Sequence, residues 1–451
     1  MNSSTKIFVT LAALLLVPLA AINAAESAKP NIIYILADDM GYADPGFMGC
    51  EDIKTPNLKK LGETGTILNS FYAQPVCSPT RAALMTGRYA VRTGIYTVVT
   101  KWGLKLEERT LAQALREAGY ETAIVGKWHL GSFEEGYRPT NRGFDHQYGL
   151  WGGVIDYFTH KIKDKLDWHR NDQPCDDQGY STHLLAKEAC RIIREKQPDK
   201  PLFLYLPFNA VHSPFQAPDE YIKPYANLKA GRSNYAGMCA AMDQAIGQVL
   251  AALDEKKIRD NTIIIFSSDN GGAMPGKVTS NGPLRAGKGT IYEGGVRVCA
   301  SVNWPGRIPA GAVINEPLHA VDWFPTLVKL AGGSLDQKLP IDGRDIWPVL
   351  TKGAKSPHET LLLCGTVPEC VALRAGDWKL LLNAKDKDAE EAPTDESGGN
   401  KVELYNLATD IGEQKDLTAE QPEKVKELRA QLDAVMKTAV APVQTQGKKQ
   451  K

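Results

Sequence analysis

The stretch that decides the fold is NIIYILADDMGYAD, residues 31–44. Its first part is a short, continuous apolar run rich in β-branched and aromatic residues. Such a run is typical of a strand that is buried on both faces of a parallel sheet. The run ends directly before Asp38 and Asp39. The stretch therefore predicts an interior strand that carries two carboxylates at its end.

Three more segments share this pattern: ETAIV (121–125), PLFLYL (201–206) and NTIIIF (261–266). Helical patterns separate them, such as EERTLAQALREAGY, with Thr110 as N-cap and Gly119 as stop, and YAGMCAAMDQAIGQVLAALDEKK. Strands that alternate with helices predict an α/β fold, with a large mixed, mostly parallel sheet that is flanked by helices on both faces.

The chain has 451 residues, enough for one large core and a smaller domain. We expect a main domain over residues 29–352. From about residue 353 the pattern changes: VALRAGDWKLLLN and KVELYNLATD predict strands, and QPEKVKELRAQLDAVMKTA predicts an amphipathic helix. Residues 353–440 are therefore expected to form a smaller antiparallel sheet plus a helix, with KDKDAEEAPTDESGGNK as an exposed loop and 441–451 as a flexible tail.

The first 25 residues have the pattern of a signal peptide. Lys6 precedes an apolar run over residues 7–21, and small residues follow it. A membrane anchor is the alternative, but the run is shorter than the roughly 20 residues that a spanning helix needs. We expect an exported protein, periplasmic or secreted, with no membrane contact after cleavage.

Charge and cysteine usage exclude two classes of function. Lys plus Arg and Asp plus Glu are both 53, so the basic excess of a nucleic-acid-binding protein is missing. None of the 8 cysteines forms a CxxC pair, which argues against a zinc knuckle. Oxidation is allowed outside the cytoplasm, and Cys364 and Cys370 are close enough in sequence to suggest a disulfide.

Each predicted strand is followed within a few positions by polar residues: Asp38, Asp39, Lys127, His129, His212, Asp269 and Asn270. Each has an ordinary alternative as a turn, a solvated cation or a structural histidine. Since the carboxyl ends of parallel strands meet at one edge of a sheet, we expect a shared site there. The four Asp and Asn side chains offer oxygen ligands, which predicts Ca²⁺ or Mg²⁺ and not zinc.

The segment CSPTRAALMTG, residues 77–87, predicts a helix with Pro79 in its first turn and Gly87 at its end. Cys77 would lie at the helix N-terminus, where the dipole favours anions, with Arg81 one turn further on. This position predicts a lowered thiol pKa and a reactive cysteine. A small buried cysteine or a disulfide partner is the alternative.

CSPTRAALMTGR resembles the Cys-x-Pro-x-Arg signature of the type I sulfatases. NIIYILADDMGYAD, VGKWHLG, VHSPF, SSDNGG and LRAGKGTIYEGGVRV resemble other blocks of that family, in the same order. The segment around residues 104–160 is most similar to the arylsulfatase B branch, which includes N-acetylgalactosamine-4-sulfatases. The resemblance implies an alkaline-phosphatase-like fold and makes residues 29–352 the catalytic domain. Cys299 stands where the family often has proline.

The resemblance also implies the cofactors. The motif cysteine, Cys77, would be converted to Cα-formylglycine by a formylglycine-generating enzyme or an anaerobic sulfatase-maturating enzyme. The hydrated aldehyde would attack sulfur and later expel the sulfate. One Ca²⁺, with Mg²⁺ as the alternative, would be bound by Asp38, Asp39, residue 77, Asp269 and Asn270.

Further roles follow from the same resemblance. Asp269 would take a proton from the attacking hydroxyl, and Arg81 would stabilise the alkoxide. Lys127 and Lys288 would bind sulfate oxygens. His212 would bind sulfate and protonate the leaving oxygen, and His129 would act as the base of the elimination step.

The segment LWGGVIDYFTHKIKDKLDWH (150–169) suggests substrate contacts. Trp151 and Tyr157 could stack on sugar rings, and Asp156 and His160 could bind hydroxyls, with core packing as the alternative. The branch resemblance implies sulfated galactose or N-acetylgalactosamine units, 4-O-sulfate favoured, cleaved from the chain end. A phosphate or phosphonate monoester hydrolase and a non-catalytic glycan-binding relative are the competing interpretations.

Overall fold

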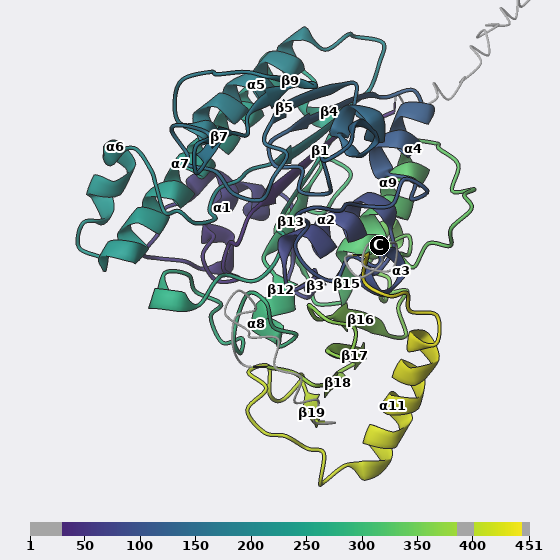
Figure 1. The fold of residues 1–451 in the computed structure, drawn as a ribbon. Coiled ribbons are helices and arrows are strands. Elements are labelled where there is room, and N and C mark those ends of the chain that lie inside the picture. Colours follow the sequence, from purple (N-terminus) through teal and green to yellow (C-terminus); the bar gives the residue numbers. More distant parts are fainter. Residues whose placement is uncertain (1–28, 386–400, 444–451) are drawn as a thin grey trace, which may run out of the picture.

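The computed structural model describes residues 29–385 and 401–443 (Figure 1). The predicted signal peptide, most of the predicted charged loop and residues 444–451 lie outside the described residues, so those interpretations stay predictions. Within the described residues, the α/β class and both sheet types are confirmed.

The main sheet has ten strands in the order β14-β2-β13-β11-β1-β10-β4-β5-β8-β9. β1 (Asn31–Ala37) lies between β10 (Leu202–Pro207) and β11 (Thr262–Ser268), parallel to both, and β4 (Glu121–Val125) follows β10. Tyr34 is in register with Tyr205 on one side and Ile265 on the other. The four predicted strands are thus adjacent, and their carboxyl ends share one edge.

Shorter strands extend this sheet on both sides. They are β2 (Thr66–Leu68), β5 (His146–Gly149), β8 (His169–Arg170), β9 (Gln173–Pro174), β13 (Ala300–Asn303) and β14 (Ala312–Ile314). Antiparallel pairs such as β11 with β13 make the sheet mixed. Two small sheets join β12 (Arg297–Val298), β3 (Phe71–Tyr72) and β15 (Leu318–His319), and β6 (Lys161–Ile162) with β7 (Lys165–Leu166).

Helices cover both faces of the main sheet (Figure 1). Ile33 and Ile35 of β1 pack in one buried cluster with α1 (Pro56–Glu63), α5 (Ser181–Glu195) and α7 (Ala230–Glu255). Tyr34 and Leu36 point to the other face, toward α2 (Cys77–Thr86), α4 (Leu111–Glu117) and α9 (Trp323–Leu330). This alternation follows from the two-residue period of a strand.

Two helices carry the expected signals. α4 begins at a capping box in which the Thr110 hydroxyl accepts the Gln113 amide. α7 is long and apolar enough to span a membrane. However, 67% of its apolar 18-residue stretch is buried inside this fold, as in the core helix of a globular domain. The shorter helices are α3 (Ala90–Thr93), α6 (Asp219–Ile222), α8 (Glu293–Val296) and α10 (Trp347–Lys352).

The C-terminal part is an antiparallel sheet covered by one helix, as predicted. Its strands are β16 (Leu361–Cys364), β17 (Val371–Ala375), β18 (Trp378–Leu382) and β19 (Val402–Asn406), and α11 (Pro422–Met436) lies beside it (Figure 1). Leu428 and Leu432 of α11 share a buried cluster with Ala83 of α2 and Tyr89. The small sheet therefore packs on the catalytic-motif helix and has no core of its own.

The predicted Cys364–Cys370 disulfide is wrong. All eight cysteines, each within the described residues, are free thiols. Cys364 packs in the cluster under α11, whereas Cys370 packs on the opposite face of the small sheet. Cys364 is paired with Val371, and Cys370 directly precedes Val371. Because successive residues of a strand point to opposite faces, the two cysteine side chains cannot meet. Cys299 is buried between β12 and β13, and its carbonyl accepts the Ser268 amide at 3.1 Å.

Candidate active site

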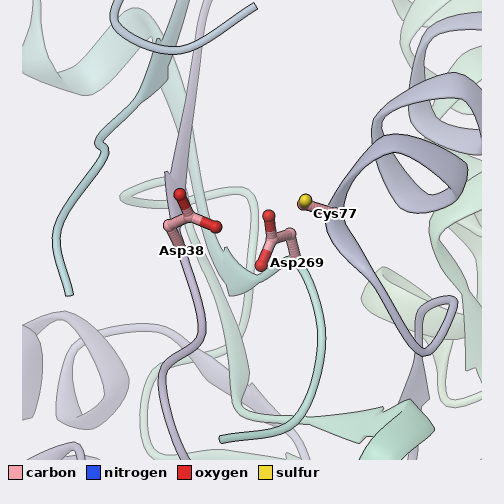
Figure 2. A group of neighbouring side chains, drawn as sticks. All are labelled: Asp38, Cys77 and Asp269. Carbon is pink, nitrogen blue, oxygen red and sulfur yellow. The ribbon is translucent and has the colours of Figure 1, made fainter. Parts of the chain in front are cut away.

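Three side chains converge at the carboxyl edge of the main sheet. Asp38 follows β1, Asp269 follows β11 and Cys77 is the first residue of α2. The Cys77 sulfur and one oxygen of each carboxylate all lie within 4.8 Å of one another, and the three point into one space (Figure 2). Cys77 is 2% exposed, and the two aspartates are fully buried. The sheet edge and the helix N-terminus thus form one buried centre.

The segment that carries Cys77 folds as its sequence predicts. Pro79 lies in the first turn of α2, and Gly87, at φ 68°, ends the helix by donating to the Ala83 carbonyl at 2.9 Å. The expected low thiol pKa is wrong, however. Burial raises the pKa of the Cys77 thiol, and the nearby Lys127 only partly opposes this effect. Cys77 is therefore a protonated thiol and not a ready nucleophile.

Buried cations surround the carboxylates. Arg81 donates to the Asp269 carboxylate and to the Lys127 carbonyl, both at 2.8 Å. The Lys127 ammonium donates to Asp38 at 2.6 Å. Burial and Asp38 raise the pKa of Asp269 to about 7, against the opposing charges of Arg81 and Lys127. Asp269 is therefore suited to hold or release a proton near neutral pH.

A second group lies beside this centre. The Asn270 amide donates to Asp39 at 2.7 Å, and Lys288 donates to the other Asp39 oxygen at 2.8 Å. Nε2 of His212 lies 3.1 Å from the Lys288 ammonium. Burial alone would raise the pKa of Asp39, but Lys288 and His212 outweigh it and hold this pKa below its ordinary value. Asp39 is thus an ionised carboxylate.

His129 contacts Cys77 directly, with Nδ1 3.2 Å from the sulfur. Its Nε2 lies 3.2 Å from the Val99 carbonyl, which can only accept, so Nε2 carries the proton and Nδ1 faces Cys77 without one. Burial, with Lys127 and Arg81, lowers the pKa of His129 well below its ordinary value. His129 is therefore a neutral base beside residue 77. Its φ of 55° is rare for this residue type.

Sequence reasoning missed the groups that hold His129. Ser78 donates to the His129 carbonyl at 2.9 Å and accepts the Val99 amide at 3.0 Å. Ser78 lies inside the quoted Cys77 motif, so a signal for it was present. Val99 contributes only backbone atoms, which no pattern of residue types reveals.

The donor set fits a hard divalent cation. Oδ1 of Asp38 and Oδ1 of Asn270 are buried and accept no hydrogen bond. A buried oxygen without a partner is costly unless a ligand satisfies it. Asp39 follows Asp38 at φ 63°, and its backbone amide donates to the Asp269 carboxylate at 3.1 Å, which ties the second group to this centre. Oxygen ligands of this kind suit Ca²⁺ or Mg²⁺.

Two of the four predicted sugar contacts are buried in the core. His160 is 1% exposed and stacks on Trp168, so a sugar hydroxyl cannot reach its ring. Tyr157 is also 1% exposed, and its hydroxyl donates to the Asn209 and His212 carbonyls at 2.5 and 2.8 Å. These two predictions are corrected, because core packing uses both rings.

The other two predicted sugar contacts are only partly free. Asp156 caps its own turn through the Phe158 and Thr159 amides. Trp151 is half-buried and stacks on His169 at 3.6 Å between ring centroids. Among the described residues, neither side chain makes a hydrogen bond or ring contact with Cys77, Asp38 or Asp269.

The family pattern described as Sulfatase matches residues 30–334, which include every residue of this centre. The chain belongs to the sulfatase family. Among curated relatives, this sulfatase is 37% identical to Arylsulfatase J of Mus musculus, over 92% of this chain and 77% of that protein. It is 34% identical to N-acetylgalactosamine-6-sulfatase of Canis lupus familiaris, over 75% of this chain and 70% of that protein.

A solved structure supports the same assignment. The crystal structure of Ps i-CgsB in complex with k-i-k-neocarrahexaose superposes with a TM-score of 0.83 at 33% identity, and covers 92% of this chain and 94% of that one. The sulfatase is thus a sulfuric ester hydrolase, and carbohydrate sulfatases are among its relatives. Its centre holds three buried cations, each bonded to a carboxylate, and His129 lies next to the Cys77 thiol.

Proposed function

We propose that this sulfatase is an exported enzyme that removes sulfate from galactose or N-acetylgalactosamine units at the ends of glycan chains, 4-O-sulfate favoured. The observation that carries the proposal is the convergence of the Cys77 sulfur with Asp38 and Asp269 within 4.8 Å. Relatives that include an N-acetylgalactosamine-6-sulfatase and an oligosaccharide complex support the sugar class. The 6-O position is the direct competitor.

We also propose that Cys77 is converted to formylglycine and that one Ca²⁺ is bound by Asp38, Asp39, Asp269 and Asn270 together with residue 77. The protonated state of the thiol supports this reading, because an unmodified Cys77 is a poor nucleophile. Together the ion and the hydrated aldehyde would supply positive charge for a sulfate oxygen and a nucleophilic hydroxyl.

The chain's own residues then have separate tasks. Arg81, Lys127 and Lys288 are already fixed by hydrogen bonds, so they can hold sulfate oxygens without reorganising. His129 accepts a proton at Nδ1, on the side of residue 77. Nε2 of His212 faces the Lys288 ammonium, so this pair would supply the proton that the leaving oxygen of the sugar takes up.

The test is sulfate release by purified protein, measured by ion chromatography. The panel contains 4-O- and 6-O-sulfated galactose and N-acetylgalactosamine, as monosaccharides and at chain ends, and one aryl alcohol as its sulfate and its phosphate ester. Mass spectrometry of the peptide that contains residue 77 establishes its conversion, and Cys77→Ala is the control. Release from 6-O-sulfates alone would overturn the preference, and phosphate release alone would indicate a phosphomonoester hydrolase.

Two further outcomes separate the remaining alternatives. Glycan binding without sulfate release by fully converted protein would indicate a non-catalytic relative. The export proposal is tested by sequencing the N-terminus of the mature protein from its native host, which should start near residue 26. A mature chain that still starts at residue 1 and stays inside the cell would contradict it.

A further inference from the structure

A buried charge cluster lies outside the proposed sulfate site and joins the C-terminal sheet to the catalytic domain. Lys379 of β18 lies 2.8 Å from a Glu293 oxygen and 2.9 Å from a Glu413 oxygen. All three side chains are fully buried. Glu293 is on α8, and its second oxygen accepts the Tyr72 hydroxyl at 2.7 Å. The cluster thus links α8 and β3 of the main domain with β18 and the segment that contains Glu413.

This cluster holds one end of the loop that carries Lys288. The Glu413 carboxylate accepts the Glu293 backbone amide at 2.6 Å, and the next amide, of Gly294, donates to the Arg285 carbonyl at 2.8 Å. The Gly294–Arg285 bond closes residues 285–294 into a loop, and the Glu293–Glu413 bond ties the base of this loop to Glu413. Lys288 lies within this loop, and its backbone amide donates to the Gly272 carbonyl at 3.2 Å.

The other end of the loop is held by the same part of the chain. The Arg285 guanidinium lies 3.9 Å from the centroid of the Tyr292 ring. It donates to the Tyr405 hydroxyl of β19 at 3.0 Å and to the Glu413 carbonyl at 2.9 Å. Both ends of the loop therefore contact the segment that includes β19 and Glu413.

Buried charges are an energetically unfavourable way to fill a core. Burial disfavours each charge, and replacing buried ion pairs by apolar residues is often neutral or stabilising. Burial also raises the pKa of Glu413 to about 7, although Lys379 opposes this effect. A buried ionic group of this kind fits a role in fixing one arrangement of the surrounding backbone. Here the backbone that it fixes carries a cation which must meet Asp39 and His212.

We propose that Lys379 and Glu413 are positioning residues. They hold the loop of residues 285–294 so that Lys288 stays at the proposed sulfate site. The C-terminal sheet is then part of the active-site scaffold, although it places no side chain next to Cys77. This inference rests on the proposed sulfate-binding role of Lys288. The effect on sulfate is indirect, since Lys379 acts through Glu293 and Glu413 acts through the Glu293 amide.

The test compares parent enzyme, confirmed as converted at residue 77, with Glu413→Gln, Lys379→Met and the double variant. Glu413→Gln keeps size and one acceptor but removes the charge. We expect it to lower kcat/KM for an aryl sulfate about tenfold, mainly through KM, because the loop loses its fixed place. Lys379→Met leaves Glu413 without its cation, whereas Glu293 keeps Arg297 at 3.4 Å, and it should lower kcat/KM further than Glu413→Gln. The double variant should recover part of this loss, since it removes a cation and an anion together.

Amide hydrogen exchange, followed by mass spectrometry, gives a readout besides activity. In Glu413→Gln, peptides that cover residues 285–295 should exchange at least fivefold faster, whereas peptides of α7 should be unchanged. Leu432→Ala is the matched control, because Leu432 is fully buried on the α11 face of the same sheet and its apolar side chain makes no hydrogen bond. It should lower Tm and leave KM unchanged.

Two results would overturn the proposal. One is a folded Glu413→Gln protein with unchanged KM and unchanged exchange over residues 285–295. The other is a Leu432→Ala protein with the same rise in KM, which would mean that the charge cluster affects activity only by stabilising the fold. If Lys379→Met does not fold, Glu413→Gln alone decides. Failure of the parent enzyme to release sulfate would instead count against the proposed function, while the exchange comparison would still test the anchoring.

Discussion

The Lys127 ammonium lies 2.6 Å from the Asp38 carboxylate, and neither side chain reaches solvent. A buried ion pair that loses one partner leaves an uncompensated charge, which costs about 3–5 kcal/mol. The same ammonium is proposed to hold a sulfate oxygen. Stability and activity should therefore both respond to its removal.

Lys127→Met tests this relationship. We expect a fall in kcat/KM for an aryl sulfate of at least about 100-fold, the usual cost of one lost charge-stabilising donor. The Tm of metal-free protein should also fall, because Asp38 keeps only the weaker contact with Arg81 at 3.7 Å. Lys424→Met, at an exposed pair on α11, serves as control and should change neither quantity. Activity within threefold of the parent would contradict the assignment.

Calcium should stabilise the folded protein through the buried Asp38 and Asn270 oxygens that accept no hydrogen bond. At 100 times its Kd, a ligand that binds only the native state adds about 2.7 kcal/mol to the free energy of unfolding. We expect Tm to rise with Ca²⁺ and to fall with a chelator, and Asn270→Ala to reduce this response. Asp156→Asn, a carboxylate away from the centre, should respond like the parent. A Tm that ignores Ca²⁺ in the parent would refute the site.

The Tyr157 hydroxyl should matter for activity through His212. It donates to the His212 carbonyl at 2.8 Å, and the ring of that histidine faces Lys288. Tyr157→Phe leaves a buried acceptor without its donor, at a cost of about 1–3 kcal/mol. We expect kcat to fall roughly tenfold. Tyr180→Phe, which removes a similar bond to the Gln216 carbonyl, should keep kcat near the parent value. Equal losses in both variants would indicate general destabilisation.

His319 should make the fold sensitive to mild acid. Burial lowers its pKa from an ordinary 6.5 to about 3, and its Nδ1 accepts the Val321 amide. Between these values the unfolded chain binds a proton that the folded chain does not, so stability falls as pH falls below about 6.5. From pH 7 to pH 5 this one group should cost about 2 kcal/mol. His319→Gln should show a smaller drop in Tm over this interval. An identical drop would contradict the prediction.

The arrangement of the centre could be predicted from the sequence because its main rules are local. Buried strands are visible as apolar runs, and the residues that follow parallel strands must share an edge. Asp38 and Asp269 meet for this reason although 231 positions separate them. The start and end of α2 followed from Pro79 and Gly87 in the same way.

The remaining features depend on contacts that no local pattern encodes. Tyrosine is a residue type that can stack on sugar rings, but the fold buries the ring of Tyr157. Lys379 and Glu413 read as ordinary polar positions, and they lie 86 and 120 residues from Glu293. The helix N-terminus and Arg81 predict a low pKa for the Cys77 thiol. Burial of this side chain raises its pKa instead, and burial is a tertiary effect.

The complete burial of α2 sets an order of events in the living cell. Every residue from Cys77 to Thr86 is enclosed by its neighbours. A second enzyme that is to alter residue 77 needs this segment extended and within its reach. The proposed conversion must therefore take place before the newly made chain folds. In protein that folds first, Cys77 would stay an unconverted thiol.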